Sequence, residues 1–216
     1  MSRPVDAMEF AREERAELAA LLATLTPAQW NAPSLCAGWR VRDVIAHMFS
    51  YDGLGPLALI GRFVKGGILL DRVNTVGVAA FADRSTDELL ALVAAHPRPR
   101  GLTAGFGGRV ALTDAMIHQQ DIRRPLGLPR TAPIPEERLR CVLQFATMAP
   151  PLRARKRIRG LTLSATDLDW RHGDGPVVTG TGEALLMGMA GRTVVVPELS
   201  GPGLPTLARR LRDAPA

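Results

Sequence analysis

This chain has few cysteines and no long apolar runs. Its 216 residues include 2 cysteines, which are too few for a disulfide framework in a protein of this length. No apolar run approaches the ~20 residues that a membrane-spanning helix needs, and the first residues contain no apolar signal-peptide segment. These absences exclude a disulfide-stabilised scaffold and a membrane protein. We expect a cytoplasmic monomer or homodimer with no membrane partner.

The two cysteines lie in different surroundings. Cys141 falls within an apolar helical pattern, which predicts a buried side chain. Cys36 lies in the loop-like segment 34–38. It could be a thiol near a functional site, but a small buried side chain is the preferred interpretation.

Lysine is scarce as well, since Lys65 and Lys156 are the lysines among 27 basic residues in a chain with a formal charge of +6. The densest basic run covers residues 153–159 and has no aromatic side chain between its cations. Surfaces that bind nucleic acid combine clustered basic residues with motifs or stacking side chains. We therefore interpret this run as a solvated linker between domains and expect no nucleic-acid partner.

Helical periodicity dominates the first two thirds of the chain. Apolar residues recur at intervals of three and four, and Ser85 with Glu88 has the sequence signature of a capping box. The predicted helices cover residues 6–25, a short turn from 27, a helix from 41 that ends before Gly53, and residues 57–65, 69–83, 86–95, 108–124 and 136–148. Helices of this number and length, with short connections, predict a mainly α fold with a four-helix bundle over residues 1–150.

The pattern changes after Gly160. Residues 161–166 alternate as a strand does, and turn residues separate them from further short apolar segments. The predicted strands are 161–166, one from 170, 177–179 and 194–196, and the predicted helices are 181–190 and 204–211. We expect residues 160–216 to form a small α+β C-terminal domain.

Three side chains of the helical part could meet at one point. Asp114 and His118 are four residues apart, so on a helix they share one face, one turn apart. His47, on a facing helix, would be the third donor. Zinc accepts imidazole nitrogen and carboxylate oxygen, and three protein ligands with an open fourth position are typical of catalytic zinc. The pattern indicates a divalent metal site, with zinc as the expected ion.

The same residues also have structural interpretations that spacing alone leaves open. Asp114 could be an exposed or capping acid, His118 a core histidine, and His47 a partner of Asp43 on its own helix. Most polar residues on helices lie at the surface, so the spacing alone does not decide between these structural roles and a metal site.

A family resemblance adds to this reading. Residues 36–47 resemble the pattern C-x-G-W-t-v-x-D-v-x-x-H of the mycothiol-dependent maleylpyruvate isomerase family, and residues 114–127 resemble its second signature, E-x-x-x-H-x-x-D-x-x-x-x-x-G. Residues 166–192 are similar to the small C-terminal domain of that family. The resemblance implies a DinB-like metal-binding bundle in which the residues at positions 47, 114 and 118 are the metal ligands. Here Asp114 stands where the family usually has glutamate, so the metal must sit closer to that helix or be bridged by water.

The resemblance also implies a cofactor and a reaction. Mycothiol would bind the metal, and its thiolate would attack a small electrophilic substrate, giving either isomerisation of a cis-enone such as maleylpyruvate or S-transfer to a halide or epoxide. Arg192 could clamp a substrate carboxylate or neutralise helix-end carbonyls. Asp121 could orient a ligand histidine or pair with Arg124, and the pairing is slightly preferred.

Two other functions remain alternatives at this point. A helical bundle can hold a metal or ligand without catalysis, and an open metal position can activate water in a hydrolase. A thiol requirement for turnover would separate the proposed enzyme from both.

Overall fold

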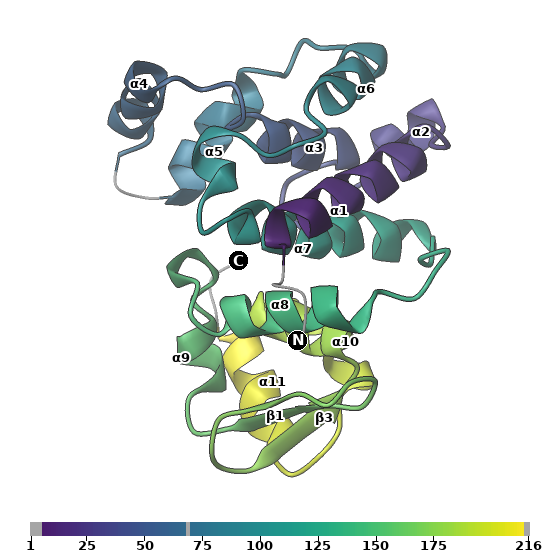
Figure 1. Ribbon diagram of the computed structural model, residues 1–216, viewed down its shortest axis with the longest axis vertical. Helices are drawn as coiled ribbons and strands as arrows, with labels where there is room; N and C mark the ends of the chain where they lie inside the picture. The colour runs from purple at the N-terminus through teal and green to yellow at the C-terminus, as the bar shows by residue number, and fades with distance from the viewer. Residues whose placement is uncertain (1–5, 68–69, 214–216) are drawn as a thin grey trace. The chain divides into compact units, whose positions relative to one another are not determined.

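The computed structural model describes residues 6–67 and 70–213 of the chain. The chain divides between Thr131 and Ala132 into two compact units (Figure 1). In the described residues, no helix is long and apolar enough to cross a membrane.

The first unit is helical. Its elements are α1 (Ala7–Leu22), α2 (Pro27–Trp30), α3 (Val41–Phe49), α4 (Pro56–Gly66), α5 (Leu70–Ala79), α6 (Thr86–Ala95), the 3₁₀ turn η1 (Gly101–Ala104) and α7 (Arg109–Leu126). Helix α1 packs against α6 and α7, and α3 packs against the same two helices. These four helices form the bundle, while α5 packs on α3 and α4 on α5. The predicted helical bundle is confirmed.

Local signals explain where several of these helices begin. The Asp6 carboxylate accepts hydrogen bonds from the backbone N–H groups of Met8 and Glu9 at the start of α1. Ser85 and Glu88 form the predicted capping box at the start of α6, with bonds of 3.2 and 2.7 Å. Both arrangements satisfy backbone donors that a helix leaves unpaired at its first turn.

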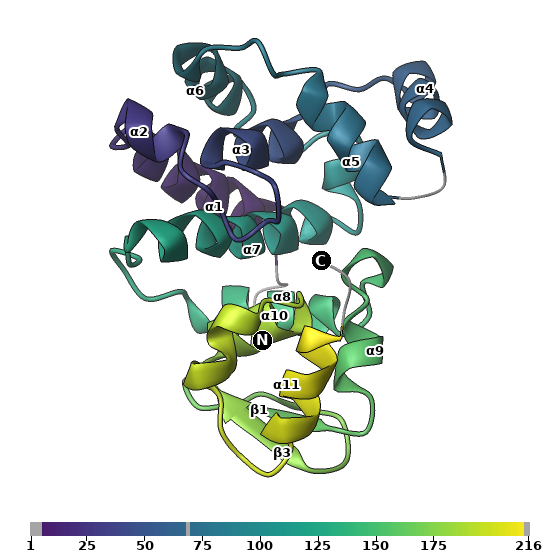
Figure 2. The same cartoon turned by 180° about the vertical axis from the view of Figure 1, so that it is seen from behind.

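Helices α1 and α7 approach each other closely and run side by side in both views (Figures 1 and 2). Gly108 precedes α7 with a φ of +91°, and a Cβ there would lie 2.7 Å from the Cα of Met8. Glycine is therefore required both for the backbone conformation and for the contact. The contact places the start of α7 against the start of α1.

The core of the first unit lies between these helices. Its buried members are Leu18, Leu21, Leu22, Trp30, Val41, Val44, Ile45, Met48, Phe49, Leu89, Val93, Ala115 and Ile122.

The second unit combines helices with a small sheet. It consists of α8 (Glu136–Ala146), η2 (Pro150–Leu152), α9 (Ala154–Ile158), β1 (Thr162–Ala165), β2 (Arg171–His172), β3 (Val177–Gly180), α10 (Gly182–Met189), η3 (Thr193–Glu198) and α11 (Leu204–Arg212). Strand β1 is central, antiparallel to β2 and parallel to β3. Helix α10 packs on β1 and β3, and α11 packs on β3. The predicted α+β character of this part is observed.

Helix α8 lies with the second unit, whereas its periodicity predicted a place in the helical part that ends at 150. The reason is its close packing on α10, where a Cβ at Gly182 would lie 2.7 Å from Cδ2 of Leu139. An amphipathic pattern shows that a helix has a buried face but not which partner covers that face.

Two further expectations differ from the structure. Residues 153–159 are not a linker, because α9 lies within them and buries Ala154 and Ile158. Residues 194–196 form part of η3 rather than a strand. The valine run favours a strand by propensity, but Pro197 in the same segment has no N–H to donate to a sheet. Residues 1–5, 69 and 214–216 of the predicted ranges lie outside the described residues.

Candidate metal centre

The structure brings His47, Asp114 and His118 together in the first unit. His47 comes from α3, and the other two come from successive turns of α7. Oδ1 of Asp114 lies 3.3 Å from Nε2 of His118 and 3.7 Å from Nε2 of His47. One donor atom from each side chain can be chosen so that all lie within 4.8 Å of one another.

These separations suit a cation of the expected size. Metal–ligand bonds of about 2.1 Å at tetrahedral angles place neighbouring donor atoms about 3.4 Å apart. The 3.3 and 3.7 Å separations lie close to that value. Two imidazoles and one carboxylate are donors that zinc accepts, so both the distances and the donor types fit a divalent metal.

The group is open on one side. The Asp114 side chain is 33% exposed, whereas those of His47 and His118 are 11% and 10% exposed. A further ligand can therefore reach the donors past Asp114. That access is what a centre with an open coordination position requires.

His47 does not pair with Asp43, and Asp114 does not cap its helix, so the structure contradicts these two alternatives. Asp43 binds Arg40 instead of His47, with its Oδ2 accepting from the Arg40 backbone N–H at 2.9 Å and from its Nε at 3.0 Å. Asp114 lies beyond the first turn of α7, whose N-cap position is Gly108. Nδ1 of His47 is buried and has no hydrogen-bond partner among the described residues.

Aromatic side chains hold the His47 ring. Its centroid lies 5.0 Å from that of Trp39 and 6.1 Å from that of Tyr51, and the His118 ring is nearly perpendicular at 5.1 Å. The Tyr51 hydroxyl donates to Oδ1 of Asn74 at 2.6 Å. Trp39 is partly buried and also packs against the core cluster. These contacts restrict the ring of His47 and direct Nε2 toward α7.

The far side of His118 faces a second carboxylate. Oδ2 of Asp121, which is fully buried, lies 2.9 Å from Nδ1 of His118. A carboxylate on one imidazole nitrogen fixes the ring and leaves the other nitrogen as a metal ligand. The contact with His118 corresponds to the orienting role, one of the two roles that the sequence offered for Asp121. The pairing with Arg124 stays a prediction.

Cys36 also reaches this carboxylate. Its Sγ lies 3.1 Å from Oδ2 of Asp121 and 3.7 Å from Nδ1 of His118. The side chain is only partly buried, so the interpretation of Cys36 as a small buried residue is wrong, whereas Cys141 is buried as predicted. Cys36, His118 and Asp121 form a second group of potential metal-binding donors that shares His118 with the first.

A proline in α7 explains how the Cys36 loop reaches this place. Pro125 lies four residues after Asp121 and has no N–H, so the carbonyl of Asp121 lacks its usual helical partner. The backbone N–H of Leu35 donates to that carbonyl at 3.0 Å. This bond fixes the loop beside α7 and brings Cys36 to Asp121. The sequence signal was the Asp121–Pro125 spacing.

The charges of the group are strongly coupled. Burial raises the pKa of the Asp114 carboxyl, but His118 and His47 outweigh burial and hold that pKa well below its usual range. Burial lowers the pKa of His118, but Asp114, Cys36 and Asp121 outweigh it and raise that pKa well above its usual value. These opposite shifts favour the ion pair between Asp114 and His118, and a metal would compete with a proton for Nε2 of His118.

Arg192 belongs to the second unit. It follows α10, and its backbone N–H donates to Met187 O at 2.9 Å. Its Nη1 lies 3.4 Å from Ala190 O. The contact with a helix-end carbonyl corresponds to one of the two roles expected for this side chain. Its role toward a substrate carboxylate stays a prediction.

Comparison with known proteins identifies the first part of the chain. Residues 11–95 match the family model described as the mycothiol maleylpyruvate isomerase N-terminal domain. This segment is similar to that domain family. The match includes Cys36 and His47, while Asp114 and His118 lie after the matched segment of the mycothiol maleylpyruvate isomerase domain.

Solved structures of mycothiol-dependent maleylpyruvate isomerase share the fold. A crystal structure of a histidine-to-alanine mutant of that enzyme has a TM-score of 0.61 and 16% identity, with 93% of each chain covered. Another crystal structure of the enzyme has a TM-score of 0.57 and 17% identity over the same coverage. The search among curated proteins finds no match. The domain match supports the family resemblance of the sequence, and the solved structures show that the fold is shared.

Proposed function

We propose that this protein is a metal- and mycothiol-dependent enzyme that acts on a small electrophilic substrate, as an isomerase of the maleylpyruvate type or as an S-transferase. The convergence of His47, Asp114 and His118 on one point in a mycothiol maleylpyruvate isomerase fold is the observation that carries this proposal. The expected ion is zinc and the expected thiol is mycothiol.

A divalent cation held there would favour the thiolate form of a thiol that coordinates it. The residues of the chain would do the rest. His47 and His118 offer neutral nitrogen donors, and the Asp114 carboxylate neutralises one positive charge. Asp121 holds the His118 ring with Nε2 toward Asp114. The exposed side of Asp114 is where thiol and substrate would enter.

Arg192 is proposed as the residue that binds a substrate carboxylate. A guanidinium can bind a carboxylate through two parallel hydrogen bonds. We expect Arg192→Ala to raise the KM for a carboxylate substrate while leaving metal content unchanged. An unchanged KM would remove Arg192 from the proposed site and leave its contact at the end of α10 as its role.

The test combines metal analysis with turnover. Purified protein is stripped with a chelator, reloaded with zinc, and assayed with mycothiol against a panel that contains a cis-enone dicarboxylate, an aryl halide and an epoxide. We expect turnover that needs both metal and thiol, and the reactive member of the panel identifies the reaction class. His47→Ala is compared with His96→Ala, because His96 lies at the end of α6 and bonds there to Leu92 O.

The other two functions give different results in the same assay. A metal retained without thiol uptake or turnover would indicate a non-catalytic metal-binding protein. Hydrolysis that needs metal but no thiol would indicate a hydrolase. Full activity of His47→Ala without added metal would contradict the proposal itself.

A further inference from the structure

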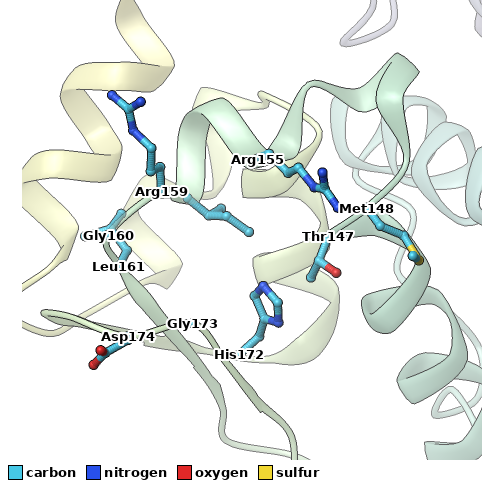
Figure 3. A pocket seen from close by; sticks show the side chains of 10 residues that line it. Thr147, Met148, Arg155, Arg159, Gly160, Leu161, His172, Gly173 and Asp174 are labelled. Atoms are coloured by element: carbon cyan, nitrogen blue, oxygen red, sulfur yellow. The ribbon is translucent and has the colours of Figure 1, made fainter.

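The second unit contains a cavity of about 570 Å³, a volume typical of small-molecule sites. It lies between the end of α8, the helix α9 and the turn after β2 (Figure 3). The residues that line it are Thr147, Met148, Arg155, Ile158, Arg159, Gly160, Leu161, His172, Gly173 and Asp174. The cavity belongs to the second unit, whereas His47, Asp114 and His118 belong to the first.

Positive charge accumulates beside the cavity. The run from Arg153 to Arg159 contains five basic residues, and Asp174 is the acidic residue of the lining. The side chains of Arg155 and Arg159 form no hydrogen bond or ion pair with residues 6–67 and 70–213. A carboxylate bound in the cavity would give the Arg155 guanidinium a hydrogen-bond partner.

Figure 3 shows how the polar side chains of the lining lie. The Arg155 guanidinium extends toward Thr147 and Met148, the His172 ring rises from the neighbouring strand, and the Arg159 guanidinium points away from these side chains. The His172 ring is stacked with Trp170, with centroids 6.1 Å apart and planes 13° apart. The stacking holds an exposed imidazole in one orientation at the wall. Arg155 and His172 together offer N–H donors to one ligand.

The remaining wall is apolar. Ile158 and Leu161 are buried at its base, and the Met148 side chain, at 56% exposed, stands at its edge. An inorganic anion would fill a small part of this volume and would leave the apolar wall in water. Burial of apolar surface contributes about 25 cal/mol per Å², so a ligand that covers this wall is favoured over an ion alone.

We propose that this cavity binds a small organic anion, whose carboxylate contacts Arg155 and His172 and whose apolar body packs on Met148 and Ile158. The ligand class is an aromatic or alicyclic carboxylate. Arg155 supplies the charge-assisted hydrogen bonds, and the cavity wall supplies the apolar contact. Binding needs neither the metal nor the thiol.

The experiment is a calorimetric titration of the full-length protein with 2-naphthoate. Its neutral counterpart 2-naphthamide has the same apolar body without the charge, and inorganic phosphate has charge without the apolar body. We expect saturable binding of one naphthoate, with the amide weaker by about tenfold, the usual value of one charge-assisted hydrogen bond. Phosphate should bind more weakly than naphthoate.

Variants locate the binding. Arg155→Gln should weaken naphthoate binding by about tenfold. Arg171→Gln is the matched control, because it also removes one positive charge. Arg171 precedes His172 in β2, so its side chain points to the opposite face of the sheet, and its loss should leave binding unchanged. His172→Phe keeps a ring on Trp170 but removes the N–H donors, and should weaken binding by less than Arg155→Gln. Circular dichroism checks that each variant is folded.

Several results would overturn the inference. These are an absence of saturable binding, equal affinity for amide and naphthoate, or equal affinity of Arg155→Gln and the parent protein. Phosphate binding as tight as naphthoate binding would reject the apolar part of the proposal. Binding that disappears in His47→Ala would place naphthoate in the first unit, whereas unchanged binding there supports the cavity even if the proposed enzyme activity fails.

Discussion

The two units treat charge in opposite ways. The first unit buries many ionisable side chains, and they contact one another: Arg15 pairs with Asp52, Arg130 with Glu14, and Asp114 with His118. The second unit keeps most of its charges at the surface, and Arg155 and Arg159 stand without a partner among the described residues. The buried charged groups of the first unit are held by the protein itself, whereas Arg155 and Arg159 of the second unit are available to a ligand.

The difference bears on what each unit can do. Removing ionisable groups from water is costly unless they are paired and hydrogen-bonded, so the polar interior of the first unit has a fixed geometry. A metal centre needs that fixed geometry in its ligands and in the groups that orient them. The exposed cations of the second unit suit weaker, exchangeable binding of an anion. The predictions below test this contrast, from the largest expected effect to the smallest.

The largest effect is expected for His47→Ala. Removal of one of three ligands leaves Asp114 and His118, which are too few to hold a cation firmly. We expect loss of bound metal and of thiol-dependent turnover, as stripping with a chelator would also cause. Elemental analysis and the turnover assay measure both, with His96→Ala as the matched histidine control. If His47→Ala retains metal at the parent level, His47 is not a metal ligand and the proposed metal centre is wrong.

Breaking a buried ion pair of the first unit should have the next largest effect. Arg15 and Asp52 are both buried, and Oδ1 of Asp52 also accepts from the Thr103 hydroxyl at 2.5 Å. Asp52→Ala leaves the Arg15 guanidinium buried without its carboxylate, which costs about 3–5 kcal/mol. Urea unfolding measures the loss, and hydrogen exchange resolved by peptide locates it.

A surface pair provides the control for this measurement. Arg12 and Glu9 also form an ion pair, but their side chains are 44% and 42% exposed. Exposed pairs contribute little to stability, so Glu9→Ala should leave the unfolding midpoint nearly where it was. If Asp52→Ala and Glu9→Ala lower the unfolding midpoint equally, the buried ion pair contributes no more to stability than the exposed pair does.

The sequence was sufficient for features that depend on nearby residues. Periodicity placed most helices within a few residues of their observed bounds, and Ser85 with Glu88 predicted a cap that the structure contains. The spacing of Asp114 and His118 placed both on one helix face, and the helical pattern around His47 offered a third donor that the family resemblance also indicated. Each of these inferences rests on a pattern that repeats within a turn or two of helix.

The sequence was insufficient where the partner comes from elsewhere in the fold. The apolar face of α8 gave no sign that Gly182 of α10 would cover it. Asp121 had two possible partners at similar spacing, and only the folded helix shows its oxygen beside His118. Cys36 lies at the site because the backbone N–H of Leu35 donates a hydrogen bond to the carbonyl of Asp121. That carbonyl is free to accept it because Pro125, one turn later, has no N–H.

Asp121→Asn tests whether the second carboxylate orients His118. An amide keeps the size of the side chain but cannot hold the imidazole through a charged oxygen, and loss of such partners typically lowers metal affinity by 10–100-fold, that is, by about 1.4–2.7 kcal/mol. A competitive titration with a zinc indicator measures the affinity. Parent-level affinity in Asp121→Asn would return Asp121 to a purely structural role.

Gly182→Ala tests the assignment of α8 to the second unit. The new Cβ would lie 2.7 Å from Cδ2 of Leu139, so a flexible side-chain end must move. Overpacking of this kind costs about 1–3 kcal/mol. We expect faster hydrogen exchange in peptides of α8 and α10, and no change in the zinc titration. Unchanged exchange in α8 would show that this contact does not hold the helix.

The smallest effect is expected for Asp114→Glu. Glutamate is one methylene longer, and the resembling family has it at this position, so its carboxylate should still reach the cation between His47 and His118. The partly exposed side chain of Asp114 leaves room for the added group. We expect zinc affinity within about tenfold of the parent, whereas Asp114→Ala, which removes the ligand, should lose the metal. The same indicator titration compares both variants. If Asp114→Glu loses metal as Asp114→Ala does, the site accepts only the shorter carboxylate. The ion would then lie close to α7, within reach of the aspartate oxygen that is 3.3 Å from Nε2 of His118.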